Sequence, residues 1–105
     1  MVSKPHKNST YIVWKTSNGV IHNEHGPALV YHDGSCIQYF FNGKLHRLDG
    51  PTSIIYEIPQ WFINGYLVTH PIYKWAREMD IDIENLTEED RCLIQIKWGD
   101  FKGVT

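Results

Sequence analysis

A ten-residue phrase occurs twice in this chain with a period of 24 residues. It reads Asn-Gly, two variable residues, His, three variable residues and Gly-Pro, at residues 18–27 and again at 42–51. A decayed third copy begins at Asn64-Gly65. A fixed period in this range is typical of repeat proteins, in which each unit packs on the next. The chain is therefore expected to form a short repeat array with a surface for binding.

The residues around each Asn-Gly predict antiparallel hairpins. Asn-Gly favours type I′ turns because both central residues need a positive φ, and Asp33-Gly34 is a further hairpin signal. Trp14 lies one residue further from its Asn than the aromatic residues of the later copies, which predicts a longer first turn. The expected strands, rich in β-branched and aromatic residues, are 11–14, 28–32, 36–41, 53–57 paired with 61–63 around Ile58-Pro59, and 66–68.

The hydrophobic period becomes helical after Pro71, which predicts a helix over about 71–79. Thr87 offers a capping hydroxyl before three acidic residues, so a second helix is expected from there to about Trp98, with Gly99 as its stop. Both helices would cap the open end of the repeats.

The whole chain of 105 residues has the length and the globular composition (42% apolar) of one domain. We expect an α+β fold, an antiparallel β-hairpin repeat meander or short solenoid capped by two C-terminal helices. Its parts would be a polar N-terminal tail at 1–10, the repeat region at 11–70 and the helical cap at 71–105.

The charge and the cysteines narrow the function classes. A net charge of −2 argues against non-specific binding to nucleic acid or to an anionic membrane, and no apolar run approaches the roughly 20 residues that span a bilayer. Cys36 and Cys92 lack zinc or redox spacing, and no secretory leader is recognisable. We expect a cytoplasmic protein with no metal and no cofactor.

An acidic run follows the first predicted helix. Seven acidic residues and no Lys or Arg lie between Glu78 and Asp90. The run is either a solvated helical face or a docking face for a basic partner. The residues assigned to the docking face are Glu78, Asp80, Asp82 and Glu84.

The repeat histidines are the main candidates for chemistry. His22 and His46 hold the same place in each copy and should line up if the units stack. A ring nitrogen would donate to a loop carbonyl beside Gly-Pro, or the imidazoles would form a row that binds a ligand. His25 and Asp49 stand just before the two Gly-Pro steps. His22 with His25, or His46 with Asp49, would therefore form either an acid–base pair or a turn that satisfies its own polar groups. The Gly-Pro steps themselves are expected to be backbone devices in which glycine permits an unusual φ.

The aromatic residues of the strands either pack in the core or form an outward stacking platform. Arg47 lies beside this face and would pair with phosphate or carboxylate. No nucleophile elbow or Cys–His arrangement is recognisable, so no catalytic residue is assigned and whether the chain is an enzyme stays open. The candidate residues for ligand or partner binding are His22, His46, Arg47, Asp49, Tyr39 and Trp61.

The copies at 18–28 and 42–52 resemble the MORN-variant repeats of small bacterial and bacteriophage proteins. The helical end, with Trp75 and the Thr87 start, is similar to a tail of phage members. The resemblance implies a stack of β-hairpins, a role in binding and no catalytic residues; a phage source implies interference with a host factor, including host defence. The chain lacks the Tyr-x-Gly-x-Trp core of ordinary MORN repeats, so phospholipid binding is not expected.

Three functions follow as hypotheses. The first is a non-catalytic module that binds a host or partner protein in the cytoplasm. The second is sequestration of a small nucleotide-type ligand on the histidine and aromatic face. The third is a small hydrolase or nuclease that uses the repeat histidines and Asp49. An exposed first strand at Tyr11–Trp14 would also allow a homodimer.

Overall fold

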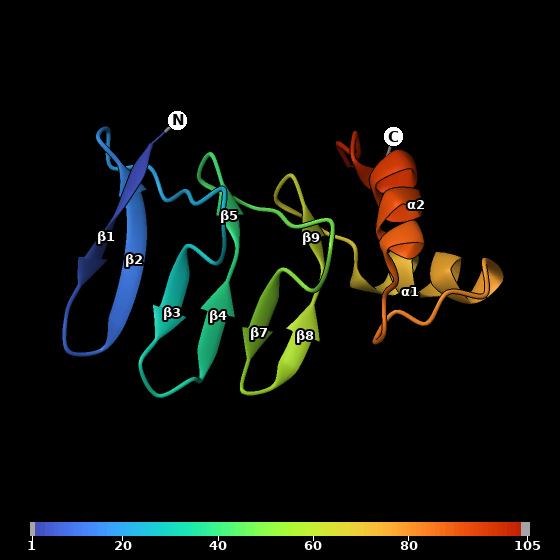
Figure 1. Cartoon of the computed structure of the whole chain (residues 1–105), viewed down its shortest axis with the longest axis horizontal. Helices are drawn as coiled ribbons and strands as arrows, with labels where there is room; N and C mark the ends of the chain where they lie inside the picture. The colour runs from blue at the N-terminus through green and yellow to red at the C-terminus, as the bar shows by residue number, and fades with distance from the viewer. Residues whose placement is uncertain (1, 104–105) are drawn as a thin grey trace.

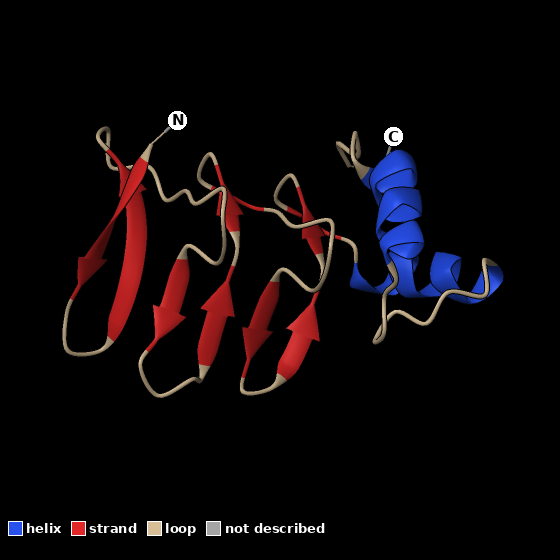
Figure 2. Cartoon of the chain, in the orientation of Figure 1, coloured by secondary structure: helices blue, strands red, loops and turns tan. Residues whose placement is uncertain are grey.

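The computed structural model describes residues 2–103 and shows an α+β chain whose strands precede its helices (Figures 1 and 2). The first strands are β1 (Ser3–Lys7), β2 (Tyr11–Thr16), β3 (Leu29–Tyr31), β4 (Cys36–Gln38), β5 (Phe40–Phe41) and β6 (Lys44–Leu45). They are followed by β7 (Ser53–Ile55), β8 (Ile58–Gln60), β9 (Phe62–Ile63), β10 (Tyr66–Leu67), α1 (Thr69–Glu78) and α2 (Glu88–Trp98).

The strands form an antiparallel meander of hairpins. One six-stranded sheet has the order β1-β2-β3-β4-β7-β8, and the short pairs β5-β6 and β9-β10 stand apart from it. Figure 1 shows the hairpins side by side along the long axis, with the helices at the far end from β1 and β2. The expected α+β fold of hairpin repeats with two C-terminal helices is confirmed.

The Asn-Gly turns behave as the sequence predicts in the second and third copies. Asn42 and Gly43 have φ values of 52° and 79° and connect β5 to β6, and Asn64 and Gly65 repeat this geometry with 52° and 84°. Both are two-residue turns with the two positive φ values of type I′. In the first copy only Gly19 has a positive φ, 81°. That turn has three residues, as the position of Trp14 predicts.

Successive turns stack on one another through the backbone. Gly43 N donates to Ile21 O over 2.8 Å, and Gly65 N donates to Leu45 O over the same distance. Like positions of neighbouring copies are therefore neighbours in space. The repeat in the sequence thus builds a repeat in the structure, because each turn supplies a carbonyl to the glycine amide of the next.

The N-terminal residues differ from the expected polar tail. Residues 3–7 form β1, which pairs along its length with β2. The turn between these strands is closed by Asn8, whose Oδ1 accepts from Thr10 N and Tyr11 N, each over 2.8 Å. Pro5 is tolerated because β1 is an edge strand, where a missing N–H leaves no ladder bond unmade. The strand Tyr11–Thr16 is therefore internal, and the free edge for pairing with another chain is β1.

The turn predicted around Ile58-Pro59 lies two residues earlier. Tyr56 and Glu57, with φ values of 47° and 67°, connect β7 to β8, and Pro59 lies inside β8. This turn could not be predicted from the residues, because neither Tyr56 nor Glu57 is a Gly, Asn or Asp. Pro59 is accommodated as Pro5 is, since β8 is the other edge of the six-stranded sheet.

The hydrophobic core lies between the third copy and the helices. Val68 takes the place that histidine holds in the first two copies, and it is 1% exposed. Its N–H donates to Trp61 O over 2.8 Å, as those of His22 and His46 do to Trp14 O and Tyr39 O. The buried cluster consists of Trp61, Ile63, Val68, Ile72, Ile94 and Trp98.

The helices begin and end close to the expected residues. α1 starts at Thr69, two residues before Pro71, which still lies in the first turn where an N–H has no helical partner. Thr87 Oγ1 accepts from Asp90 N over 3.1 Å, and Asp90 Oδ2 accepts from Thr87 N over 3.1 Å, so the predicted cap of α2 is confirmed. Gly99 ends α2 in a right-handed conformation (φ −57°), without the left-handed stop typical of glycine.

Candidate functional site

A groove of about 400 Å³ lies between the loops of the first two copies. It is lined by the loops 23–26 and 46–49 and by residues 39–41. Four of the six residues predicted for binding line it together, namely Tyr39, His46, Arg47 and Asp49. We call this the repeat groove.

The two repeat histidines connect neighbouring copies. His22 Nδ1 accepts from the backbone N–H of Asn42 over 2.9 Å, and His46 Nδ1 accepts from the N–H of Asn64 over 3.0 Å. The expected alignment of the imidazoles is observed, but the ring accepts from the next Asn-Gly turn where donation to a carbonyl beside Gly-Pro was expected. Each ring thus accepts from a backbone N–H of the next Asn-Gly turn, and that N–H has no partner within the turn to which it belongs.

His22 is fully buried, with 0% of its surface exposed. Because Nδ1 is an acceptor, the neutral ring carries its proton on Nε2, which lies 3.4 Å from Glu24 Oε1. This hydrogen bond from His22 is the main cause that lowers the pKa of Glu24. Phe41 places its ring edge against His22, with 4.7 Å between the ring centroids. His22 therefore lies beneath the repeat groove and is not part of its surface.

His46 is partly exposed in the groove. Burial lowers the pKa of its imidazole, which favours the neutral ring that can accept the Asn64 N–H. Phe41, which is 43% exposed, lies beside it with 6.3 Å between ring centroids. Phe41 was not singled out from the sequence, although its place directly before an Asn-Gly turn in the middle of the array could have suggested it.

Arg47 is held by three contacts, two within its own loop and one with Tyr39. Its Nε donates to Asp49 Oδ1 over 2.8 Å, its Nη1 donates to Pro51 O over 3.0 Å, and its guanidinium lies 4.0 Å from the centroid of the Tyr39 ring. The guanidinium also explains Gly50, because a Cβ there would lie 2.7 Å from Arg47 Cζ. Gly50 and Gly26 do not have the positive φ expected of them. Gly50 provides space for the Arg47 side chain instead.

These contacts bear on whether the groove side chains could act as an acid–base pair or stack on a base. The carboxylate of Asp49 contacts Arg47, and among residues 2–103 no hydrogen bond joins it to His46, so the expected acid–base pair of His46 and Asp49 is not observed. One face of the Tyr39 ring is covered by the guanidinium, which leaves less of it for stacking on a base. Burial raises the pKa of the Cys36 thiol, which keeps it protonated and a poor nucleophile.

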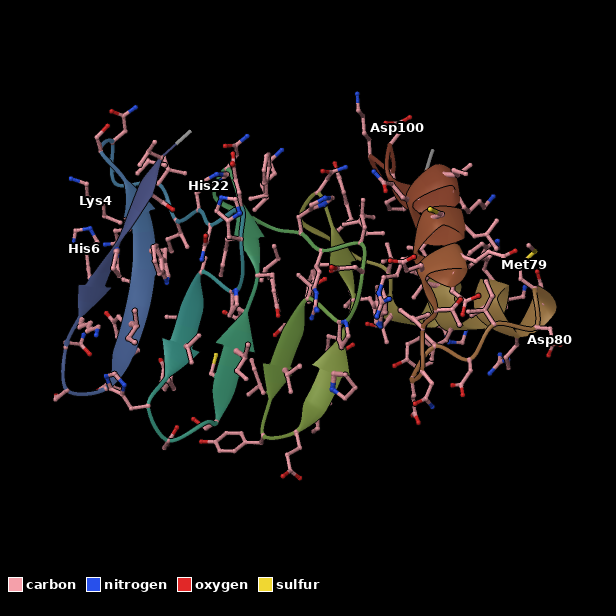
Figure 3. The ribbon with its side chains drawn as sticks, viewed as in Figure 1. Lys4, His6, His22, Met79, Asp80 and Asp100 are labelled. Atoms are coloured by element: carbon pink, nitrogen blue, oxygen red, sulfur yellow. The ribbon has the colours of Figure 1, made fainter. Side chains whose placement is uncertain are left out.

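Two other predictions are placed away from the groove. Trp61 is 1% exposed and belongs to the core, so its assignment to a binding surface is wrong. The four acidic residues assigned to a docking face, Glu78 to Glu84, are exposed at the end of α1 and in the loop to α2. Figure 3 shows Asp80 at this far end of the molecule, remote from His22. Asp82 is also a turn residue, whose Oδ1 accepts from Glu84 N over 3.1 Å.

Comparison with protein-family models, with curated proteins and with solved structures finds no match. Within residues 2–103, no helix is long and apolar enough to cross a membrane. In the same residues no three His, Cys, Asp or Glu side chains gather as a metal site would require.

Proposed function

We propose that this chain is a non-catalytic binding module that holds a partner protein at the repeat groove. The observation that supports this most is the state of the groove side chains. His46 and Arg47 are held by hydrogen bonds within the array, so these side chains of the groove are already positioned before a partner binds. Binding to a rigid surface costs less conformational entropy than binding to one that must order.

The composition of the groove suits a protein partner. Phe41 offers an exposed aromatic ring in the groove, and the exposed polar residues Glu24, His25 and Asp49 line it as well. An aromatic anchor surrounded by polar groups is the usual arrangement of an interface hot spot. A volume of about 400 Å³ suits one or two inserted side chains of the partner.

The class of partner is proposed from the resemblance of the Asn-Gly repeats. If the chain is phage-encoded, as the resemblance of its repeats implies, the partner is a host protein, including a defence protein. We place this interaction in the cytoplasm, where the free thiols of Cys36 and Cys92 would stay reduced. The exposed acidic residues at Glu78 to Glu84 would offer a second, electrostatic contact for a basic partner.

The test is a pull-down from the native host with matched variants. Wild type and Ile96→Ala, which removes an apolar side chain 81% exposed on α2, should retain the same partner in constant ratio to the bait. Phe41→Ala should lose it by about tenfold or more, as expected for an aromatic anchor. Circular dichroism would verify that each bait is folded. Retention by all three baits alike, or by none at any salt concentration, would contradict the proposal.

A further inference from the structure

A second groove, of about 740 Å³, lies where the edge hairpin meets the second Asn-Gly turn. Its lining shares no residue with the repeat groove. Lys4 and His6 come from β1, Lys15 comes from β2, and Asn18 and Asn42 come from the first two repeat turns. Figure 3 shows Lys4 and His6 on the same side of β1. We call this the edge groove.

The charge of the edge groove is uncompensated. Lys4 and Lys15 are directly opposite each other in the register of β1 and β2, so their side chains leave the same face of the sheet. No acidic residue lines the groove, and no salt bridge among residues 2–103 uses either lysine. Like charges directly opposite across two strands are destabilising. A bound anion would remove that repulsion.

The repeat asparagines supply hydrogen-bond donors beside the lysines. Within the described chain, the side-chain amides of Asn18 and Asn42 make no hydrogen bond, whereas Asn64 Nδ2 in the third copy donates to Phe101 O over 2.7 Å. The position of Asn42 is fixed, because its backbone N–H is bound by His22 Nδ1. Two of the three motif asparagines are therefore free to donate, and both line the edge groove.

The groove also has an apolar side and a suitable size. Val2 and Val20, which are 78% and 36% exposed, line it together with the polar residues. A volume of about 740 Å³ lies within the range of sites for small organic ligands, roughly 300–1,000 Å³. An inorganic anion alone would leave most of this space empty.

We propose that the edge groove binds a nucleoside polyphosphate or a closely similar phosphorylated small molecule. The ammonium groups of Lys4 and Lys15 contact the phosphate oxygens as point charges, and the amides of Asn18 and Asn42 donate to them. The organic part of the ligand lies against Val2 and Val20. This goes beyond the protein-binding role of the repeat groove and does not depend on it.

The test is a titration of the full chain with ATP, with pyrophosphate and with adenosine. Binding is measured by calorimetry and by NMR of the asparagine side-chain amides. ATP should bind, pyrophosphate should bind more weakly and adenosine should not bind detectably. The amide signals of Asn18 and Asn42 should shift, and those of Asn64 should not. Lys4→Gln with Lys15→Gln should weaken ATP binding by about tenfold or more, because a charge-assisted contact is lost at each site.

The matched control is Lys74→Gln with Lys97→Gln, which removes the same charge from exposed positions on the helices. It should bind ATP as wild type does. Equal loss in both double variants would mean a non-specific charge effect and would overturn the proposal, as would no binding of ATP at millimolar concentration. Salt-sensitive self-association that only the Lys4 and Lys15 changes abolish would instead make the groove a contact with the acidic end of a second copy, and would also overturn it.

Discussion

At the scale of single residues, the repeat histidines hold neighbouring copies together. The imidazole is long enough to reach the next turn, and its unprotonated nitrogen accepts a backbone N–H there. Val68 stands in this place in the third copy, where the next element is a helix and no further Asn-Gly turn needs an acceptor. Histidine therefore occupies this position where the next turn has an N–H to pair, and valine occupies it where the next element is a helix.

Replacement of His22 by alanine is predicted to destabilise the fold. The change leaves the N–H of Asn42 without its acceptor and opens a cavity at a residue that is 0% exposed. We expect a loss of about 2–4 kcal/mol in the free energy of unfolding, measured by urea denaturation. His25→Ala, at an exposed position in the same loop, should change it by less than about 0.5 kcal/mol. Equal effects of the two changes would contradict the role given to His22.

Stability is predicted to fall in mild acid because of His46. Burial lowers the pKa of His46 in the folded chain below its value of about 6.5 in an unfolded chain. The unfolded chain therefore binds more protons, so the contribution of His46 is complete above about pH 6.5 and is lost as the pH falls below it.

The measurement is the urea midpoint at several pH values for wild type and for His46→Asn. Asparagine Oδ1 can accept the Asn64 N–H from nearly the same place and does not titrate in this range. The urea midpoint of wild type should fall relative to that of His46→Asn as the pH falls towards about 5.5. A constant difference across this range would show that His46 does not titrate on unfolding.

At the scale of the element, each hairpin depends on the backbone conformation of its turn. Asn42-Gly43 and Asn64-Gly65 adopt positive φ with residues suited to it, whereas Tyr56-Glu57 adopts the same conformation with residues that are not. A left-handed conformation costs a residue other than glycine roughly 1–2 kcal/mol. The hairpin β7–β8 therefore carries local strain, which its pairing with β4 and the hydrogen bond from Tyr56 N to Ser35 O overcome.

Substitution in this turn is predicted to stabilise the protein. Glu57→Gly removes the cost of a φ of 67° and should raise the free energy of unfolding by about 0.5–1 kcal/mol after the greater freedom of glycine in the unfolded chain is considered. Gly65→Ala, at a φ of 84°, should lower it by a similar amount. Thermal melting of the two variants beside wild type gives the comparison, and a lower melting temperature for Glu57→Gly would contradict the account of strain.

At the scale of the whole molecule, burial is uneven along the axis of 43 Å. The core lies between the third copy and the helices, whereas β1 is exposed along nearly its whole length and pairs only with β2. The array is therefore anchored at its helical end. The edge hairpin of β1 and β2 lies at the end with less packing (Figure 1). Residues of both strands line the edge groove.

Hydrogen exchange is predicted to follow this gradient. Amides of β9 and α2 that lie beside Ile63 and Ile94, each 0% exposed, should exchange only on global unfolding. Amides of β1 should exchange by local opening, faster by a factor of about 100 or more. NMR-detected exchange under native conditions provides the measurement. Uniform protection from β1 to α2 would show that the chain opens only as a whole.

The sequence alone determined the features that depend on neighbouring residues. The type I′ turns at Asn42-Gly43 and Asn64-Gly65 and the cap at Thr87 were predictable because the residues that impose each conformation lie within it. The helical end and the stacking of the copies followed from the hydrophobic period and the repeat.

Only the tertiary structure decided the rest, because contacts between residues distant in the sequence control it. Residues 3–7 become a strand because β2 offers a partner, not because their composition favours one. Trp61 is buried and Phe41 exposed although both are aromatic residues near an Asn-Gly turn, since the helices cover only the last copy. The histidines accept from the next turn only because the copies stack on one another. The same stacking places Asn18 and Asn42 beside the lysines of the edge groove.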